Sequence, residues 1–409
     1  MQGEEVQPTQ QELMDGNGVI RWIDGHEEQL IEQLRGWVDL NSGLDNEAGR
    51  QQMIDALQLE YESLGFQCRR LHHEQGFTHL VAMRPSAKPD ALKVLLLGHV
   101  DTVYDSDGTF LSFQREGEWA SGPGVGDMKG GLVVTLAMLR ALQSISRLDD
   151  FDWVAVHNSD EEIGSPTSRD VIERMATGRD LCLDFEIGRS SGAVARSRAG
   201  VGAFFCEVEG KSAHAGMEPE KGINAVLAAS TLMAEVVALA DHSRGTKINI
   251  GRITGGNKRN IVAENCRFEI DVRVQSTKEA ERVERALHDL KGARASSLPW
   301  ERGSAQVHLF GRFSRPPWPR GAASDRLAGH FQTVANDLGI DLPAEDTGGG
   351  SDANFPAALG VATIDALGPV GEGTHTHHER IRVHTVASRA KLCAIALLRW
   401  QRSEPVMAT

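Results

Sequence analysis

Apolar residues form two recurring patterns in the first half of the chain. Segments 26–41 and 53–64 place them three and four positions apart, the spacing of one face of an α-helix. Residues 130–142 form a further helical segment of small and aliphatic residues. Short continuous apolar runs, typical of strands buried on both faces, follow at 94–97, 153–156 and 181–183. Buried strands alternating with helices predict an α/β domain with a mostly parallel sheet.

The pattern changes near Gly200. Residues 266–274 alternate strictly between apolar and charged side chains, which predicts a strand with one face in water. Three further strands are expected at 201–208, 247–253 and 306–310, and two helices at 223–240 and 277–290. The resulting β-α-β-β-α-β order predicts a small ferredoxin-like domain. Ser276 and Glu279 have the spacing of a capping box at the start of its second helix.

The α/β pattern resumes after residue 312. A helix is expected at 324–338, a strand at 361–364 and a last helix at 385–400. We therefore predict a discontinuous α/β domain made of residues 1–199 and 313–409. Residues 200–312 would be a second domain inserted into it.

Composition and charge narrow the class of protein. A chain of 409 residues suits about two domains. With 40% hydrophobic and 24% charged residues, it is not a largely disordered protein. The net charge of −14 argues against nucleic acid and anionic membranes as partners, because both attract basic surfaces. No stretch has the roughly 18 apolar residues of a membrane span.

Five widely spaced cysteines without a CxxC pair favour free thiols in a reducing compartment. The N-terminus is acidic and polar, and it lacks the basic and apolar regions of a secretory signal. We therefore expect a cytoplasmic protein.

The first chemically informative motif, GHVDT, stands where the 94–97 run ends. His99 and Asp101 are two residues apart on a strand and project to the same side. A metal-bound histidine usually gives its other N–H to such an acceptor, although a structural His–Asp pair has the same pattern.

The second motif, GVGDMKGG, surrounds Asp127 with glycines that allow close approach to a ligand. An aspartate that caps the following helix is the alternative.

Carboxylates follow the other two strands. Asp160, Glu161 and Glu162 stand in a row after the 153–156 run, and a cation would offset their mutual repulsion. A solvated acidic loop is the alternative. Glu186 follows the 181–183 run in the same way. Carboxylates and imidazole without thiolates suit zinc, cobalt or manganese, and two such ions sharing a carboxylate would form a hydrolytic site.

Histidines late in the chain could complete this site. The candidates, with a His-rich surface loop as the alternative, are His375, His377, His378 and His384. In the inserted segment, His214 stands alone in a turn of small residues, and Arg273 lies on the polar side of its strand. A structural histidine and a solvated arginine are the commoner cases for such positions.

Together these motifs resemble the M20 family of metallopeptidases, most closely its glutamate carboxypeptidase branch. Five motifs occur in the family's order between about residue 90 and the C-terminus. The resemblance implies a di-zinc α/β domain with an inserted dimerisation domain. It also implies a homodimer with two Zn²⁺ per subunit, or Co²⁺ or Mn²⁺ in their place.

The resemblance implies a role for each residue of the motifs. Glu161 would be the catalytic base, Asp101 would orient His99, and His214 would polarise the substrate carbonyl in the partner subunit's site. The metal ligands would be His99, Asp127 as the bridge, Glu162, Glu186 and His375. Substrate contacts would come from Arg273, which pairs with a carboxylate, and from Asn260, Gly349 and Ser351.

The expected activity is therefore hydrolysis of the amide bond to a C-terminal amino acid, with acidic residues among the candidates. The substrate would be a small peptide or an N-acyl amino acid. An N-acyl amino acid deacylase or a dipeptidase of the same family is the alternative enzyme. A non-catalytic metal-binding relative would be marked by a lost base or ligand, and this sequence has lost none.

Overall fold

The computed structural model describes residues 9–295 and 303–400. Residues 1–8, which contributed to the expected absence of a secretory signal, lie outside this range. The chain divides into two compact units. The first contains the residues up to Ser197, Arg320–Asp346 and the residues from Ser351 onward, and the second contains Arg198–Pro319 and Thr347–Gly350.

The first unit is built on a six-stranded sheet in the order β1-β2-β6-β3-β7-β15. Its strands, in that order, are Gln67–His72, Thr78–Arg84, Phe151–Asn158, Leu92–His99, Leu181–Asp184 and Ala362–Ile364. The four strands from β6 to β15 are parallel, whereas β1 and β2 pair antiparallel at one edge. The predicted α/β class with a mostly parallel sheet is confirmed.

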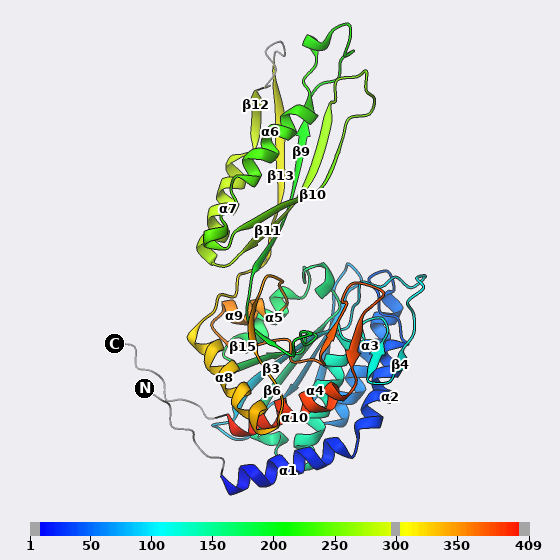
Figure 1. Cartoon of the computed structure of the whole chain (residues 1–409), viewed down its shortest axis with the longest axis vertical. Helices are drawn as coiled ribbons and strands as arrows, with labels where there is room; N and C mark the ends of the chain where they lie inside the picture. The colour runs from blue at the N-terminus through cyan, green and yellow to red at the C-terminus, as the bar shows by residue number, and fades with distance from the viewer. Residues whose placement is uncertain (1–8, 296–302, 401–409) are drawn as a thin grey trace, which may run out of the picture. The chain divides into compact units, whose positions relative to one another are not determined.

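Helices cover both faces of this sheet (Figure 1). They are α1 Gln10–Asp24, α2 Glu27–Val38, α3 Glu47–Ser63, α4 Lys129–Ser144, α5 Arg169–Ala176, α8 Ala322–Asp337, α9 Asn354–Ala358 and α10 His384–Arg399. Alternate residues of β3 face opposite layers. Val94 and Leu96 belong to the core shared with α4 and α10, and Leu95 and Leu97 to the core shared with α5 and α9. No helix in the described ranges is long and apolar enough to cross a membrane.

Short strands complete the first unit. A four-stranded sheet has the order β16-β17-β5-β4. Its strands are Gly371–Glu372, Arg380–Arg382, Trp119–Ser121 and Gln114–Glu116. β8 (Val194–Arg198) pairs with β14 (Ala344–Thr347).

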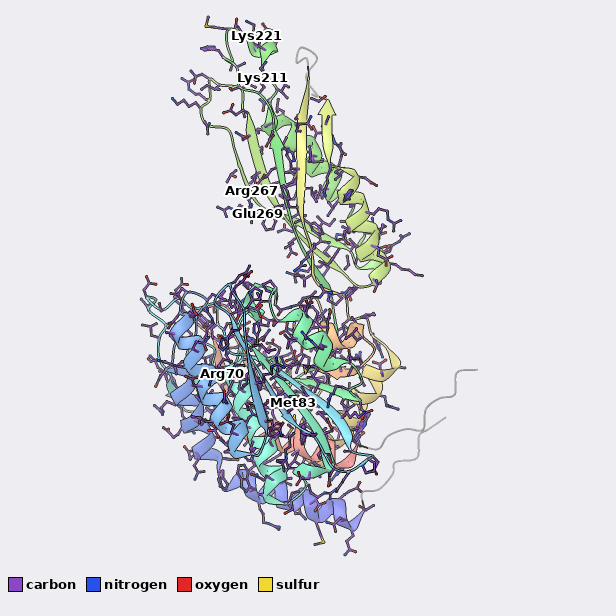
Figure 2. The ribbon with its side chains drawn as sticks, turned by 180° about the vertical axis from the view of Figure 1, so that it is seen from behind. Arg70, Met83, Lys211, Lys221, Arg267 and Glu269 are labelled. Carbon is purple, nitrogen blue, oxygen red and sulfur yellow. The ribbon has the colours of Figure 1, made fainter. Side chains whose placement is uncertain are left out.

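The second unit is an antiparallel sheet with the strand order β10-β11-β9-β13-β12. The strands are Lys247–Gly255, Asn265–Val274, Gly200–Glu209, Ser304–Arg315 and Gly292–Ala295, and the helices are α6 Ala225–Val237 and α7 Thr277–Asp289. The helices pack on the apolar face of the sheet, as the alternation in β11 predicts. Arg267 and Glu269, labelled in Figure 2, belong to its opposite, charged face.

The capping box at the start of α7 forms only in part. The Ser276 hydroxyl accepts the Glu279 N–H at 3.3 Å, as predicted. The Glu279 carboxylate, however, accepts hydrogen bonds from the Thr246 hydroxyl at 2.7 Å and from the Arg282 guanidinium at 2.7 and 2.9 Å. These partners, first Arg282 one turn along the same helix and then Thr246, lower the pKa of Glu279 to about 2.

Candidate active site

Loops at one edge of the central sheet carry the predicted metal-binding residues. His99 ends β3, Glu186 follows β7, and Glu161 and Glu162 lie in a 3₁₀ turn directly after β6. These are the carboxyl ends of neighbouring parallel strands, where ligands bind in open α/β sheets. Two further segments bring Asp127, just before α4, and His375, in the turn between β16 and β17.

Asp127 lies between two groups of side chains. Its Oδ1 atom is 3.0 Å from His99 Nε2, which is itself 3.7 Å from Glu186 Oε1. Its Oδ2 atom is 3.3 Å from His375 Nε2, which is 3.1 Å from Glu162 Oε2. Each carboxylate oxygen of Asp127 thus faces a different histidine and a different glutamate.

The donor set fits a pair of divalent cations. Ligand atoms of His99, Asp127 and Glu162 lie within 4.8 Å of one another, and so do those of His99, Glu161 and Glu186. Burial and repulsion from Asp127 raise the pKa of Glu162 to about 8 and that of Glu186 well above its usual range. Ionising these buried, neighbouring carboxyl groups is therefore unfavourable, and cations would offset that cost. Oxygen and nitrogen ligands without thiolates suit zinc, cobalt or manganese.

Hydrogen bonds to the same carboxylates raise the pKa values of the two histidines. Bonds to Asp127 and Glu162 raise the pKa of His375 to about 10. Burial alone would lower the pKa of His99, but its contacts with Asp101 and Asp127 raise it well above the usual value. Both rings thus hold a proton at a nitrogen that could instead bind a cation.

Asp101 connects two of these groups. His99 Nδ1 is 3.0 Å from the Asp101 carbonyl oxygen and 3.5 Å from its Oδ1 atom. Asp101 Oδ2 accepts the Glu162 N–H at 3.0 Å. This fully buried carboxylate therefore contacts the His99 ring and the Glu162 backbone at once, as a positioning residue would.

The glycines around Asp127 are explained by close packing. A Cβ atom on Gly131 would lie 1.9 Å from the Phe185 carbonyl oxygen, and one on Gly130 would lie 2.4 Å from the Val125 carbonyl oxygen. The start of α4 therefore lies against the backbone that leads to Glu186, and only glycine fits there.

The late histidines lie in different surroundings. His375, at φ +62°, directs Nε2 to Asp127 and Glu162. The ring of His377 instead stacks on Phe110 with 5.7 Å between centroids. His378 lines a groove with residues that include Trp119 and Arg380. Of these three rings, the structure brings that of His375 to the other predicted ligands.

Two residues beside the site were not assigned a role from the sequence. Glu379 is fully buried, and its Oε1 atom accepts the N–H groups of Gly126 at 2.8 Å and Asp127 at 3.0 Å. Its Oε2 atom is 2.6 Å from the Tyr104 hydroxyl. The only sequence signal was that Glu379 ends the late histidine motif, and nothing in the sequence pointed to Tyr104.

The residues predicted in the inserted domain belong to the second unit. His214 Nδ1 accepts the N–H groups of Gly216 at 3.2 Å and Met217 at 3.1 Å. The Asn260 carbonyl accepts the Ala215 N–H at 3.1 Å, so the segments of His214 and Asn260 lie side by side. Arg273 is bound by a neighbour on its own strand, because Asp271 accepts two hydrogen bonds from its guanidinium, each 2.8 Å long.

Gly349 and Ser351, the predicted substrate contacts of the glycine-rich loop, both make hydrogen bonds within the fold. The N–H of Gly349 donates to Thr347 Oγ1 at 3.2 Å. Ser351 is buried: its hydroxyl donates to Asp365 at 2.6 Å, and its N–H donates to Asn354 at 3.0 Å. Both of its donors are bound within the fold, and the substrate contact by Ser351 stays a prediction.

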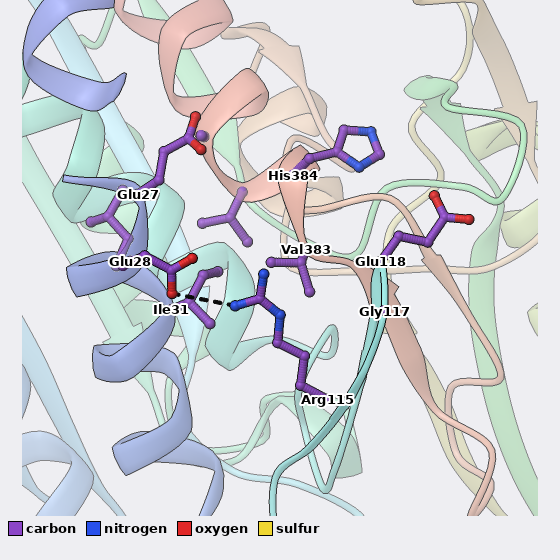
Figure 3. A pocket seen from close by; sticks show the side chains of 11 residues that line it. Glu27, Glu28, Ile31, Arg115, Gly117, Glu118, Val383 and His384 are labelled. Carbon is purple, nitrogen blue, oxygen red and sulfur yellow. Dashed lines mark hydrogen bonds and ion pairs between the residues drawn. The ribbon is translucent and has the colours of Figure 1, made fainter. Parts of the chain in front are cut away.

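A separate small cavity of about 140 Å³ lies between the start of α2, the β4–β5 turn and the start of α10 (Figure 3). Its lining combines apolar residues, including Ile31 and Val383, with Glu118 and His384 at the edge. Arg115 Nη1 is 3.3 Å from Glu28 Oε2 across it. Of the residues that the sequence suggested for the site, the alternative late histidine His384 lines this cavity, and the proposed ligands do not.

Comparison with known proteins identifies relatives of the chain. A model of peptidase family M20/M25/M40 matches residues 95–399. Carboxypeptidase G2 from Pseudomonas sp. (strain RS-16) is 28% identical over 370 residues, covering 89% of this chain and 88% of the relative.

Solved structures share the fold at low sequence identity. A tripeptidase from Staphylococcus aureus superposes with a TM-score of 0.75 at 19% identity, covering 91% of this chain and 99% of that one. A dinuclear metal-binding peptidase of the M20 family from Bacillus subtilis gives a TM-score of 0.62 at 14% identity, covering 92% and 98%.

Proposed function

The chain belongs to the M20/M25/M40 family of metallopeptidases, and from this premise we propose that it cleaves the amide bond to a C-terminal amino acid. The substrate would be a small peptide or an N-acyl amino acid, with acidic C-terminal residues as the first candidates. The observation that carries the proposal is Asp127, whose two oxygens face two separate histidine–glutamate groups.

Two divalent cations, proposed to be zinc with cobalt or manganese as alternatives, would bind in these groups. His99, Asp127 and Glu186 would hold one ion, and Asp127, Glu162 and His375 the other. Such a pair of ions lowers the pKa of a water molecule and polarises a carbonyl group. Asp101 lies at the Nδ1 side of the His99 ring and would keep the Nε2 atom of His99 directed to the first ion.

Glu161 is the proposed general base. Its carboxylate lies within 4.8 Å of the ligand atoms of His99 and Glu186, where it would be close to a water bound by the ions. It would take a proton from that water as the oxygen–carbon bond forms. It would then give the proton to the leaving nitrogen as the carbon–nitrogen bond breaks.

His214 is proposed to polarise the substrate carbonyl in the partner subunit's site, which requires a homodimer. Because its Nδ1 atom accepts two backbone N–H groups, the neutral ring carries its proton on Nε2. That N–H is a suitable donor to the developing oxyanion. Asn260, whose backbone binds the residue after His214, would contribute a contact from the same segment.

Arg273 is the proposed partner of the substrate carboxylate. Its guanidinium already binds one carboxylate in the two-point geometry that recognition requires. A substrate would have to displace Asp271, so the binding free energy would be reduced by the loss of that pair. The loop of Gly349 is proposed to line the substrate side.

The proposed location is cytoplasmic. All five cysteines are free thiols, and four of them are buried. Structural thiols of this kind are typical of proteins in reducing compartments.

A substrate panel tests the proposed activity. Protein freed of metal and then supplied with zinc, cobalt or manganese should hydrolyse peptides or N-acyl amino acids with a free C-terminal carboxylate. Methyl esters of the same compounds are the matched controls, and they should react far more slowly. Faster hydrolysis of N-acetyl amino acids or of dipeptides would favour the deacylase or the dipeptidase. Folded protein with two bound ions and no activity on any compound would contradict the proposal.

A further inference from the structure

Tyr104 connects two loops that the fold brings together from distant parts of the chain. It lies five residues after His99, and its side chain is buried beside Phe110, with 5.2 Å between ring centroids. Its hydroxyl is 2.6 Å from Glu379 Oε2 and 2.8 Å from the Thr376 carbonyl oxygen. A single hydroxyl therefore contacts the residue after His375 and the carboxyl group that ends the same turn.

Glu379 extends this connection to Asp127. Its other oxygen accepts the N–H groups of Gly126 and Asp127 at 2.8 and 3.0 Å. The contacts thus run from the Tyr104 hydroxyl through the Glu379 carboxyl group to the Asp127 backbone. Both groups are buried, so water does not compete for these hydrogen bonds.

The turn that carries His375 is exposed from His375 to His378. The side chain of His375 is 57% exposed, and its backbone has a positive φ of 62°. Within the turn, Thr376 bonds to the Gly373 carbonyl through its N–H and its hydroxyl. A contact from outside the turn would therefore reduce the conformational entropy lost when His375 meets Asp127.

We propose that Tyr104 is a positioning residue that holds the His375 turn and the Asp127 loop in the geometry that binds two cations. The inference rests on the proposed function, because it takes His375 and Asp127 to be metal ligands. Tyr104 acts through Glu379 and Thr376, and it touches neither the ion nor the substrate.

The chain provides a matched control, because it contains only two tyrosines. Tyr61 is also fully buried, and its hydroxyl is 2.8 Å from His157 Nε2. Among the described residues, the Tyr61 hydroxyl bonds to neither ligand-bearing loop. Tyr61→Phe and Tyr104→Phe each remove one buried, hydrogen-bonded hydroxyl, but only the second should alter metal binding.

Calorimetric titration of the metal-free proteins with Zn²⁺ tests this difference. For Tyr104→Phe we expect at least one of the two binding steps to weaken by about 10- to 100-fold, the usual effect of removing an outer partner of a ligand. Activity of this variant at limiting zinc should fall and should recover with excess zinc. Tyr61→Phe should bind zinc as the unsubstituted protein does.

A measurement on the unsubstituted protein avoids any failure of a variant to fold. With 3-fluorotyrosine in place of tyrosine, the ¹⁹F spectrum has one resonance for each position, and Tyr61→Phe assigns them. Zinc should shift the Tyr104 resonance and leave that of Tyr61 unchanged.

Three results would overturn the inference. The first is Tyr104→Phe protein that binds both ions with unchanged affinity, and the second is equal weakening in both variants. The third is a Tyr104 resonance that zinc does not move. In each case two ions still bind the unsubstituted protein, so the proposed function stands. Failure of the unsubstituted protein to bind zinc would instead overturn both.

Discussion

Glu186 in the first unit and Glu279 in the second are both buried, 8% and 6% exposed. Their pKa values nevertheless shift in opposite directions. Burial and repulsion from Asp127 raise the pKa of Glu186 well above its usual range. Hydrogen bonds from Arg282 and Thr246 lower the pKa of Glu279 to about 2. Burial alone therefore does not mark a cation site. Glu186 differs from Glu279 in that its neighbour is another carboxylate, Asp127, in place of an arginine.

The same distinction separates neighbours in one acidic run. Asp160 is fully buried, and its two oxygens accept hydrogen bonds from the hydroxyl and N–H groups of Thr167 and Ser168. Glu162, two residues later, lies with Asp127 beside the same nitrogen, Nε2 of His375. The run DEE thus contains one carboxylate that stabilises its own turn and one that faces the proposed metal pair.

The largest expected effect is at Glu161, between these two neighbours. Glu161→Gln should lower kcat by about 10²- to 10⁴-fold, because no group would accept the proton of the attacking water. Both ions should remain bound, since Glu161 is proposed as the base. Steady-state kinetics together with metal analysis checks this. Loss of an ion in the variant would show that Glu161 is a ligand instead.

Zinc should stabilise the first unit. A ligand that binds only the folded state contributes about 2.7 kcal/mol to the free energy of unfolding at 100 times its dissociation constant. Urea unfolding of metal-free protein with and without zinc measures this difference. Asp127→Asn should remove most of it, because the shared carboxylate is lost. An equal zinc effect in that variant would contradict the role of Asp127.

A smaller loss of stability is expected at Glu279. Glu279→Gln should reduce the free energy of unfolding by about 2 kcal/mol, because it removes charge-assisted hydrogen bonds. Metal content should not change. Urea unfolding and metal analysis of the variant together test this. A loss of bound zinc would show that Glu279 affects the metal site and is not purely structural.

The pH dependence at Glu279 has a defined sign. The folded state holds the pKa of this carboxyl at about 2, below the ordinary value of 4.5. Its contribution to stability is therefore complete above pH 4.5 and is lost as the pH falls toward 2. The free energies of unfolding of the unsubstituted protein and of Glu279→Gln should therefore converge as the pH is lowered from 6 to 2. A constant difference across this range would contradict the assignment.

Sequence patterns predicted the elements that bury a regular face. The apolar run at 94–97 became β3, and the strict alternation at 266–274 became β11. The edge strand β1 and its neighbour β2 were missed. β1 is a mixed run of polar and apolar residues with no fully buried position, so neither period appears in it.

The candidate site could be predicted where residues follow buried strands, as for His99 and Glu186. The bond between Tyr104 and Glu379 could not, because the two residues are 275 positions apart. Ser351 shows the opposite limit. Its place beside the glycine loop suggested a substrate contact, and no local pattern reveals that its hydroxyl is buried against Asp365.

The central claim is that Asp127 holds two cations at once, one through each oxygen. The number of zinc ions bound per chain, measured by calorimetric titration of metal-free protein and of Asp127→Asn, tests it most directly. We expect two ions for the unsubstituted protein and the loss or marked weakening of both in the variant. A single ion in the unsubstituted protein, or two ions bound with unchanged affinity in Asp127→Asn, would contradict it.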